Sequence, residues 1–158
     1  MKREKFLWPL TQSHHRGLVL AKHVREKLTD CPKDEEGTRV KEALEEVRRV
    51  YEEELRQHFW DEERILALYE AHVGKEEPLP MKIRKDHRTL ESLMAQGDLQ
   101  SLLTFAETLS AHIRFEEEEL FSGWEKVLGE ADKKVVGEFL IKGIPPGCAT
   151  TPEPRPLV

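Results

Sequence analysis

The chain has 158 residues and a formal net charge of −6 at neutral pH, and 35% of its residues are charged. This length is that of one domain with a core of its own, and the abundance of Glu, Leu, Lys, Arg and Ala predicts an all-α fold. The negative charge argues against a nucleic acid as a partner, and no apolar run approaches the roughly 20 residues that span a bilayer.

The N-terminus and the cysteines indicate a cytoplasmic protein. The stretch 1–9 is basic, but no apolar segment with a cleavage site follows it, so we expect no signal peptide. Cys31 and Cys148 lie far apart and form neither a CxxC motif nor a disulfide framework, which favours a reducing compartment.

Apolar residues recur at three- and four-residue spacing in four segments, the pattern of helices with one buried face. The predicted helices cover residues 11–28, 38–72 and 80–95, and a fourth begins after Asp98, a favourable N-cap residue. We expect the fourth helix to bend near Ser122 and Gly123, and a shorter helix to follow over 131–141.

Short connections between the predicted helices determine the expected architecture. Consecutive helices joined by short loops run antiparallel, so the chain is predicted to form an up-down-up-down four-helix bundle with a short extra C-terminal helix. From Ile144 onward the chain has five prolines in fifteen residues. We therefore predict one helical domain over 1–143 and a proline-rich tail over 144–158.

A histidine and a glutamate stand four residues apart at four places, whereas about one such pair is expected by chance among seven histidines. His58/Glu62 and His112/Glu116 both lie on the apolar face of a predicted helix, where this spacing points both side chains the same way. A histidine and a carboxylate are two ligands for a borderline metal such as iron. Without a partner, such polar groups on an apolar face would cost free energy.

The other two long helices each add a histidine on the apolar face. On the third helix it is His87, followed four residues later by Glu91, which is either a surface residue or a further ligand. On the first helix His14 and His15 compete, and we favour His14 because His15 shares a face with basic residues. Four helices that each point a histidine inward predict a dinuclear metal centre inside the bundle.

The remaining candidates have simpler interpretations. A single buried histidine is commonly bonded to a carboxylate without any metal, so only the combination indicates a metal centre. His23 and His72 are interpreted as surface or helix-end residues, and the run Glu117–Glu119 as a solvated acidic face. At about 1.5 Å per residue, the third helix places its histidine ~12 Å out of level with the second unless the 74–80 connection climbs back along the bundle.

The order of one histidine, then HxxxE, then one histidine, then HxxxE on four successive helices resembles the hemerythrin-like cation-binding (HHE) domain, over residues 11–128. The resemblance implies a non-haem di-iron centre with carboxylate and oxo or hydroxo bridges. It makes His14 (or His15), His58, His87 and His112 terminal ligands, with Glu62 and Glu116 bridging the two metals.

The chain departs from the oxygen-carrying hemerythrins at two positions. They have HxxxH on the third helix, where this chain has His87 and Glu91, and their last carboxylate is an aspartate at a longer spacing, where this chain has Glu116. The pattern is closer to the variant domains of iron- and oxygen-sensing proteins, so reversible oxygen carriage is not what the resemblance implies.

The functional expectation is therefore a protein that binds or senses oxygen, nitric oxide, peroxide or iron through a His/Glu di-iron centre, rather than an enzyme. Zinc or another divalent metal is the alternative occupant. A di-iron oxidase or peroxidase is a second hypothesis, although the ExxH motifs of ferritin-like sites are absent from the sequence. A metal-free helical bundle that serves a structural role is the third.

Overall fold

The computed structural model describes residues 2–142, and every element in this range is helical, with no strand. The α-helices are α1 (Trp8–Leu28), α2 (Glu36–Val50), α3 (Arg56–Val73), α4 (Pro78–Gln96), α5 (Leu99–Phe115), α6 (Phe121–Val127) and α7 (Glu130–Lys142). Short 3₁₀ turns, η1 (Lys5–Leu7) and η2 (Lys33–Glu35), precede α1 and α2. No described helix is both long and apolar enough to cross a bilayer. The predicted tail over 144–158 lies outside the described residues.

Two rods are continuous across a widened turn of the helix. The π-helical turn η3 (Tyr51–Leu55) joins α2 to α3, and a second, η4 (Glu116–Leu120), joins α5 to α6. α6 runs through Ser122 and Gly123, where a bend was expected, and Gly123 packs beside Tyr69 of α3. The irregularity lies earlier, at η4, and π-turns inside α-helices occur frequently at functional sites.

The helix ends follow from local chemistry. The Asp98 side chain accepts a hydrogen bond from the Ser101 backbone N–H at 2.7 Å and caps α5, as predicted. Gly74 and Gly97 terminate α3 and α4 with φ angles of +89° and +66°, a region that glycine enters without steric cost. Pro78 opens α4 at a position where its missing N–H breaks no helical bond.

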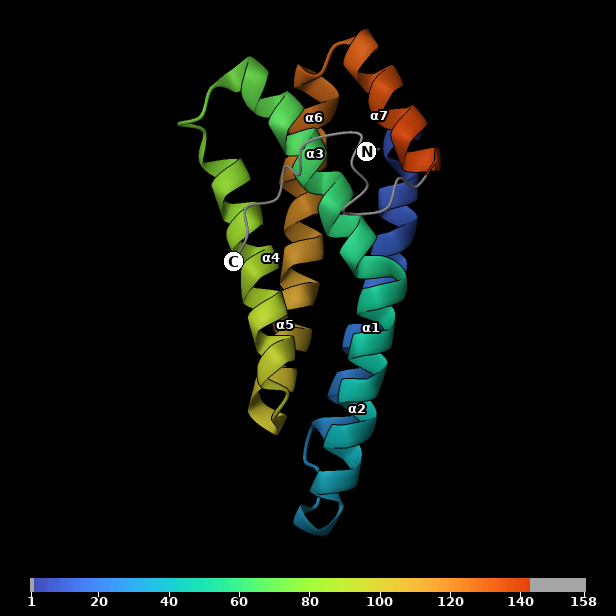
Figure 1. The fold of residues 1–158 in the computed structure, drawn as a ribbon, viewed down its shortest axis with the longest axis vertical. Helices are drawn as coiled ribbons and strands as arrows, with labels where there is room; N and C mark the ends of the chain where they lie inside the picture. The colour runs from blue at the N-terminus through green and yellow to red at the C-terminus, as the bar shows by residue number, and fades with distance from the viewer. Residues whose placement is uncertain (1, 143–158) are drawn as a thin grey trace.

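The four rods lie side by side, and successive rods run in opposite directions (Figure 1). They are α1, the α2–α3 rod, α4 and the α5–α6 rod, and the short α7 packs across one end against η1, α1 and α3. The connection after α3 descends along the rods before α4 begins (Figure 1). This descent removes the expected mismatch in height and brings His87 Nε2 to 3.1 Å from Glu62 Oε1.

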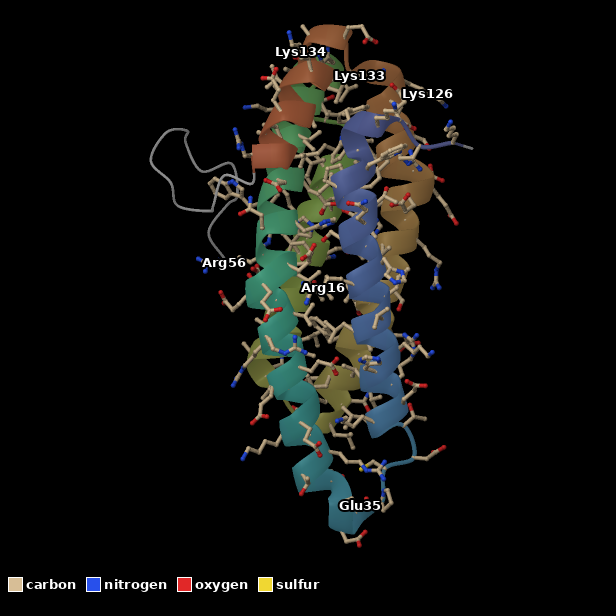
Figure 2. The ribbon with its side chains drawn as sticks, turned by 90° about the vertical axis from the view of Figure 1, so that its right-hand side faces the viewer. Arg16, Glu35, Arg56, Lys126, Lys133 and Lys134 are labelled. Carbon is tan, nitrogen blue, oxygen red and sulfur yellow. The ribbon has the colours of Figure 1, made fainter. Side chains whose placement is uncertain are left out.

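Side chains fill the space between the rods (Figure 2) and form two apolar clusters separated by a polar layer. The first core cluster includes Leu20, Val24, Val47, Leu102 and Phe105. The second core cluster includes Leu10, Ile65, Leu120, Phe121 and Trp124. Between members of the two clusters stand His14 on α1, Glu62 on the α2–α3 rod, His87 on α4 and Glu116 on the α5–α6 rod. The fold thus places ionisable side chains at the middle of its core.

Close contact between α1 and α5 beside this layer depends on one glycine. A Cβ atom on Gly17 would lie 2.8 Å from Cδ1 of Ile113, so α1 approaches α5 more closely than a larger residue would permit without rearrangement. His14 precedes Gly17 by three residues, and Glu116 follows Ile113 by three. The close approach therefore helps to bring these two side chains together.

Candidate metal centre

Six of the predicted residues meet between the two core clusters. They are His14, His58, Glu62, His87, His112 and Glu116, and we call them the histidine–carboxylate layer. Each is at most 4% exposed. Each of the four rods contributes one histidine, and the α2–α3 and α5–α6 rods each contribute a glutamate as well. Helical spacing of four residues is thus sufficient to point each His/Glu pair into the core.

The layer divides into two groups that share both carboxylates. One group consists of His14, His58, Glu62 and Glu116, and the other of Glu62, His87, His112 and Glu116. Within each group, one ligand atom from every residue lies within 4.8 Å of the others, so each group could hold a metal ion. Because Glu62 and Glu116 belong to both, two ions bound here would have two carboxylates in common.

The two oxygens of Glu62 face different halves of the layer. Its Oε1 lies 3.1 Å from His87 Nε2, whereas its Oε2 lies 3.0 Å from His58 Nε2 and 3.8 Å from His14 Nε2. A carboxylate that turns one oxygen toward each half has the orientation required of a bridge between two cations.

Glu116 occupies the middle of the layer. Its Oε1 lies 3.0 Å from His14 Nε2, 3.1 Å from His112 Nε2 and 3.9 Å from His58 Nε2. Its position at the start of η4 places it where the helix turn is widened. Together with Glu62, it supplies the negative charge toward which all four Nε2 atoms point.

Outer carboxylates bond to two of the four imidazoles from behind and lie near a third, that of His87, whose Nδ1 makes no hydrogen bond within the described structure. The Nδ1 atoms of His14, His112 and His87 lie 2.6, 3.1 and 3.6 Å from carboxylate oxygens. The partners, in the same order, are Glu117, Asp86 and Glu63. A carboxylate that accepts a hydrogen bond from Nδ1–H leaves the Nε2 lone pair for a metal, which is the usual arrangement of metal-binding histidines.

Aromatic rings fix two of the imidazoles and exclude water from them. Phe59 stacks on His87 with ring centroids 4.1 Å apart, and Phe121 stacks on His14 at 5.1 Å with an interplanar angle of 7°. Both phenylalanines are at most 1% exposed. The rings therefore have little freedom to rotate, which preorganises the inward nitrogens.

Without a metal, the layer raises the pKa values of its histidines His14 and His112 and lowers that of Glu116. Burial alone would lower the pKa of His112, but the charge of Glu116 and the bond to Asp86 raise that pKa to about 10. His14 behaves alike, because bonds to Glu116 and Glu117 outweigh burial and raise its pKa well above the usual value. Burial would raise the pKa of Glu116, but the facing imidazoles hold it well below the usual range. Metal binding must displace such protons.

Several ligand atoms of the layer lie in ion-pair contact but make no hydrogen bond, which matches the needs of a cation. His58 Nε2, His112 Nε2, Glu62 Oε2 and Glu116 Oε2 are buried and make no hydrogen bond within the described structure. Buried polar atoms without partners are costly, and a divalent ion among two imidazoles and two carboxylates would satisfy these atoms. Imidazole nitrogen and carboxylate oxygen together suit iron, zinc and similar divalent metals. The donor set therefore fits a metal, although it does not identify which one.

Two of the predicted candidates lie outside the layer. His15 is exposed on the outer side of α1, so of the two competing histidines the structure brings His14 inward. Glu91 accepts a hydrogen bond from the Tyr51 hydroxyl and belongs to neither group. His23 and His72 are exposed, as interpreted, and bond to Glu46 and Asp132.

The outer carboxylates were missed by periodicity, and Glu117, interpreted as a surface residue, is partly buried and bonds to His14. Glu117 follows Glu116 in η4, and the larger number of residues in a π-turn reduces the angle between successive side chains. Glu117 thus bonds to Nδ1 of His14, while Glu116 bonds to Nε2 of the same ring. For the other two outer carboxylates, the available signal was that each stands next to a candidate ligand in the sequence. Asp86 precedes His87, and Glu63 follows Glu62.

The chain matches no protein-family model, no curated protein and no solved structure. The functional conclusion therefore depends on the histidine–carboxylate layer itself.

Proposed function

We propose that this chain is a hemerythrin-like, non-haem di-iron protein with an up-down-up-down four-helix architecture, which binds or senses a small ligand such as oxygen, nitric oxide or peroxide. The observation that supports it best is the sharing of Glu62 and Glu116 between two pairs of histidines. One ion needs about four protein ligands in a closed structural site. Six converging ligands with two shared carboxylates are better suited to two ions.

In this proposal His14 and His58 would hold one iron and His87 and His112 the other, with Glu62 and Glu116 shared between the two groups. Bound iron would supply reversible one-electron redox chemistry and coordination positions for a small ligand, since each group offers only two histidines and two shared carboxylates. Glu117, Asp86 and Glu63 orient the imidazoles. Phe59 and Phe121 keep bulk water from them.

Binding or sensing is preferred over an oxidase of the ferritin type because the sequence lacks the ExxH pairs of such sites. The metal-free bundle is disfavoured by the cost of placing six ionisable side chains in a water-poor layer without a cation.

Metal analysis of the full chain, purified both with and without air, tests the proposal. We expect two iron ions per chain, near-ultraviolet absorption in the ferric form, and a spectral change when the reduced protein meets oxygen or nitric oxide. Glu116→Ala should lower the metal content below two per chain because both groups lose a ligand. Glu119→Ala, an exposed residue of the same η4 turn, serves as the matched control and should keep two. One zinc ion per chain, or no metal in either preparation, would overturn the proposal.

A further inference from the structure

A pocket of about 160 Å³ leads to the histidine–carboxylate layer beside His58. Its walls come from α1, η3, α3 and α7, which contribute Ser13, Glu54, Gln57, Asp61 and Leu140 among others. No lysine or arginine is among the described residues that line it. The pocket therefore connects the outside of the rods to one of the six candidate ligands.

His58 is the imidazole of the layer that the outer carboxylates leave open. The Nδ1 atoms of His58 and His87 are both buried and make no hydrogen bond within the described structure, but His87 Nδ1 lies 3.6 Å from Glu63 Oε1, and of the two only His58 lines the pocket. The Ser13 hydroxyl is another buried polar group without a hydrogen bond. Ser13 is 6% exposed, and its Oγ has no hydrogen-bond partner within the described structure. Both His58 and Ser13 line the pocket, so its inner end is built for a polar occupant.

The charge of the pocket determines what kind of occupant this is. Glu53 and Glu54, with side chains 50% and 29% exposed, lie at its mouth, and Asp61, at 5%, lies at its base. The Gln57 side chain donates a hydrogen bond to Asp61 Oδ1 at 2.9 Å and holds that carboxylate in place. A cleft lined by acidic groups concentrates cations and raises their rate of association. Hydroxyl and carboxylate oxygens, such as those that line the pocket, can bind a divalent cation before it reaches the layer.

Basic side chains moderate this charge at the mouth, where Arg49 Nη1 lies 3.6 Å from Glu53 Oε2. Arg16, labelled in Figure 2 where α1 faces the α2–α3 rod, donates hydrogen bonds to Glu54 at 3.0 Å and to Glu53 at 3.1 Å. Arg16 does not line the pocket itself. It partly neutralises the two glutamates and holds them beside the opening.

We infer that this pocket is the route by which divalent metal ions enter the histidine–carboxylate layer, with Glu53 and Glu54 attracting the ion and Asp61, Ser13 and His58 receiving it. The inference rests on the proposed metal-binding function. It adds the path of loading and assigns a role to residues outside the ligand set.

The test is the rate at which the metal-free full chain takes up Co²⁺ or anaerobic Fe²⁺ in a stopped-flow spectrophotometer, with the final stoichiometry measured separately. Glu54→Gln should slow uptake and Arg16→Gln should speed it, because the two changes alter the charge at the mouth in opposite directions. Asp61→Asn should also slow uptake, because an amide offers the entering cation a weaker ligand than a carboxylate. All three should reach the wild-type stoichiometry, and salt should slow the wild type more than Glu54→Gln.

Glu118→Gln is the matched control, because Glu118 is exposed on η4 and does not line the pocket. It should load at the wild-type rate. Opposite effects of the two mouth variants cannot arise from loss of folding, which would slow both. Wild-type uptake rates in Glu54→Gln and Arg16→Gln, with full stoichiometry, would overturn the route alone. A wild-type chain that takes up no metal would overturn the proposed function and the route together.

Discussion

The first core cluster and the histidine–carboxylate layer are adjacent on the same rods, and both are almost fully removed from water. Leu102 and Phe105 in the cluster are at most 1% exposed, as are Glu62 and His87 in the layer. In the cluster, burial itself is favourable, at roughly 25 cal/mol for each Å² of apolar surface. In the layer, burial disfavours the charged forms of the histidines and glutamates.

Equal burial thus has opposite consequences in the two regions. The stabilisation that the cluster contributes depends neither on bound metal nor, near neutral pH, on protonation. The layer is stabilised only while positive charge lies between its carboxylates, either as protons on the imidazoles or as metal ions. The comparison predicts that the layer responds to metal and pH and that the cluster does not.

Removal of the metal should have the largest effect on stability. A ligand that binds only the folded state contributes about 4 kcal/mol when its free concentration is 1,000 times Kd, which corresponds to ~10 °C in Tm for a chain of this size. We expect chelation to lower Tm, followed by circular dichroism, by at least this amount. His58→Ala should melt like the chelated protein and should respond little to the chelator.

His72→Ala is the control for this experiment, because His72 is exposed and bonds to Asp132 Oδ2 at 2.7 Å, away from the layer. It should keep the wild-type metal content and lose stability on chelation as the wild type does. The assignment of His58 as a ligand fails if both variants retain full metal and melt at the same temperature.

Truncation in the first core cluster should destabilise both forms equally. Leu102→Ala removes a side chain that is 0% exposed, and such changes cost about 3 kcal/mol through lost burial and an internal cavity. Leu102 stands ten residues before His112 on α5, or ~15 Å along the helix, so the two regions should contribute additively. Urea unfolding of the loaded and metal-free proteins checks this. A cost that differs between the two forms by more than about 1 kcal/mol would show that the regions are coupled.

A change of one pH unit should have the smallest effect, and its sign separates the two forms. The pKa of His112 is about 10 in the folded metal-free protein against an ordinary 6.5. The stability that it contributes is therefore complete below pH 6.5 and is lost as the pH rises through about 10. The loss is at most about 1.4 kcal/mol for each pH unit. Metal affinity rises over the same range because the ligands must be deprotonated.

The difference in Tm between loaded and metal-free protein should consequently widen from pH 6.5 to 8.5. At the acid end, Glu116 contributes stability above its ordinary pKa of 4.5 that is lost as the pH falls through its lower folded value. Melting curves of both forms from below pH 4.5 up to pH 8.5 provide the measurement. Parallel curves would mean that the layer does not exchange protons for metal.

Periodicity and end signals were sufficient for the helices. The predicted segment 38–72 corresponds to the continuous rod from α2 through α3, and the cap at Asp98 is confirmed. Apolar spacing determines which side of a helix is buried, and this is a local property of the sequence. The descent of the connection after α3 is different, because it depends on how the rods pack and no single residue signals it.

The meeting of six candidate ligands was predictable because spacing and apolar faces placed each of them inward. Glu117, Asp86 and Glu63 were not predicted, since their positions depend on contacts between rods and, for Glu117, on the π-turn at η4. An α-helical wheel gives the direction of each side chain only while the turn stays regular. The pocket beside His58 is likewise a property of four packed elements.

The π-turns η3 and η4 also make the length of these two rods part of the site. Each turn holds an additional residue in comparison with an α-helix, so it rotates everything after it relative to everything before it. In the α2–α3 rod, η3 lies between Val47 in the first core cluster and the His58/Glu62 pair. Deletion of one exposed residue there, such as Glu53, would leave a more regular helix in which either Val47 or Glu62 no longer faces the core. A shorter rod would be a more regular helix, but it would no longer orient the candidate ligands. We therefore expect insertions and deletions at η3 and η4 to damage the site more than substitutions at the same exposed positions.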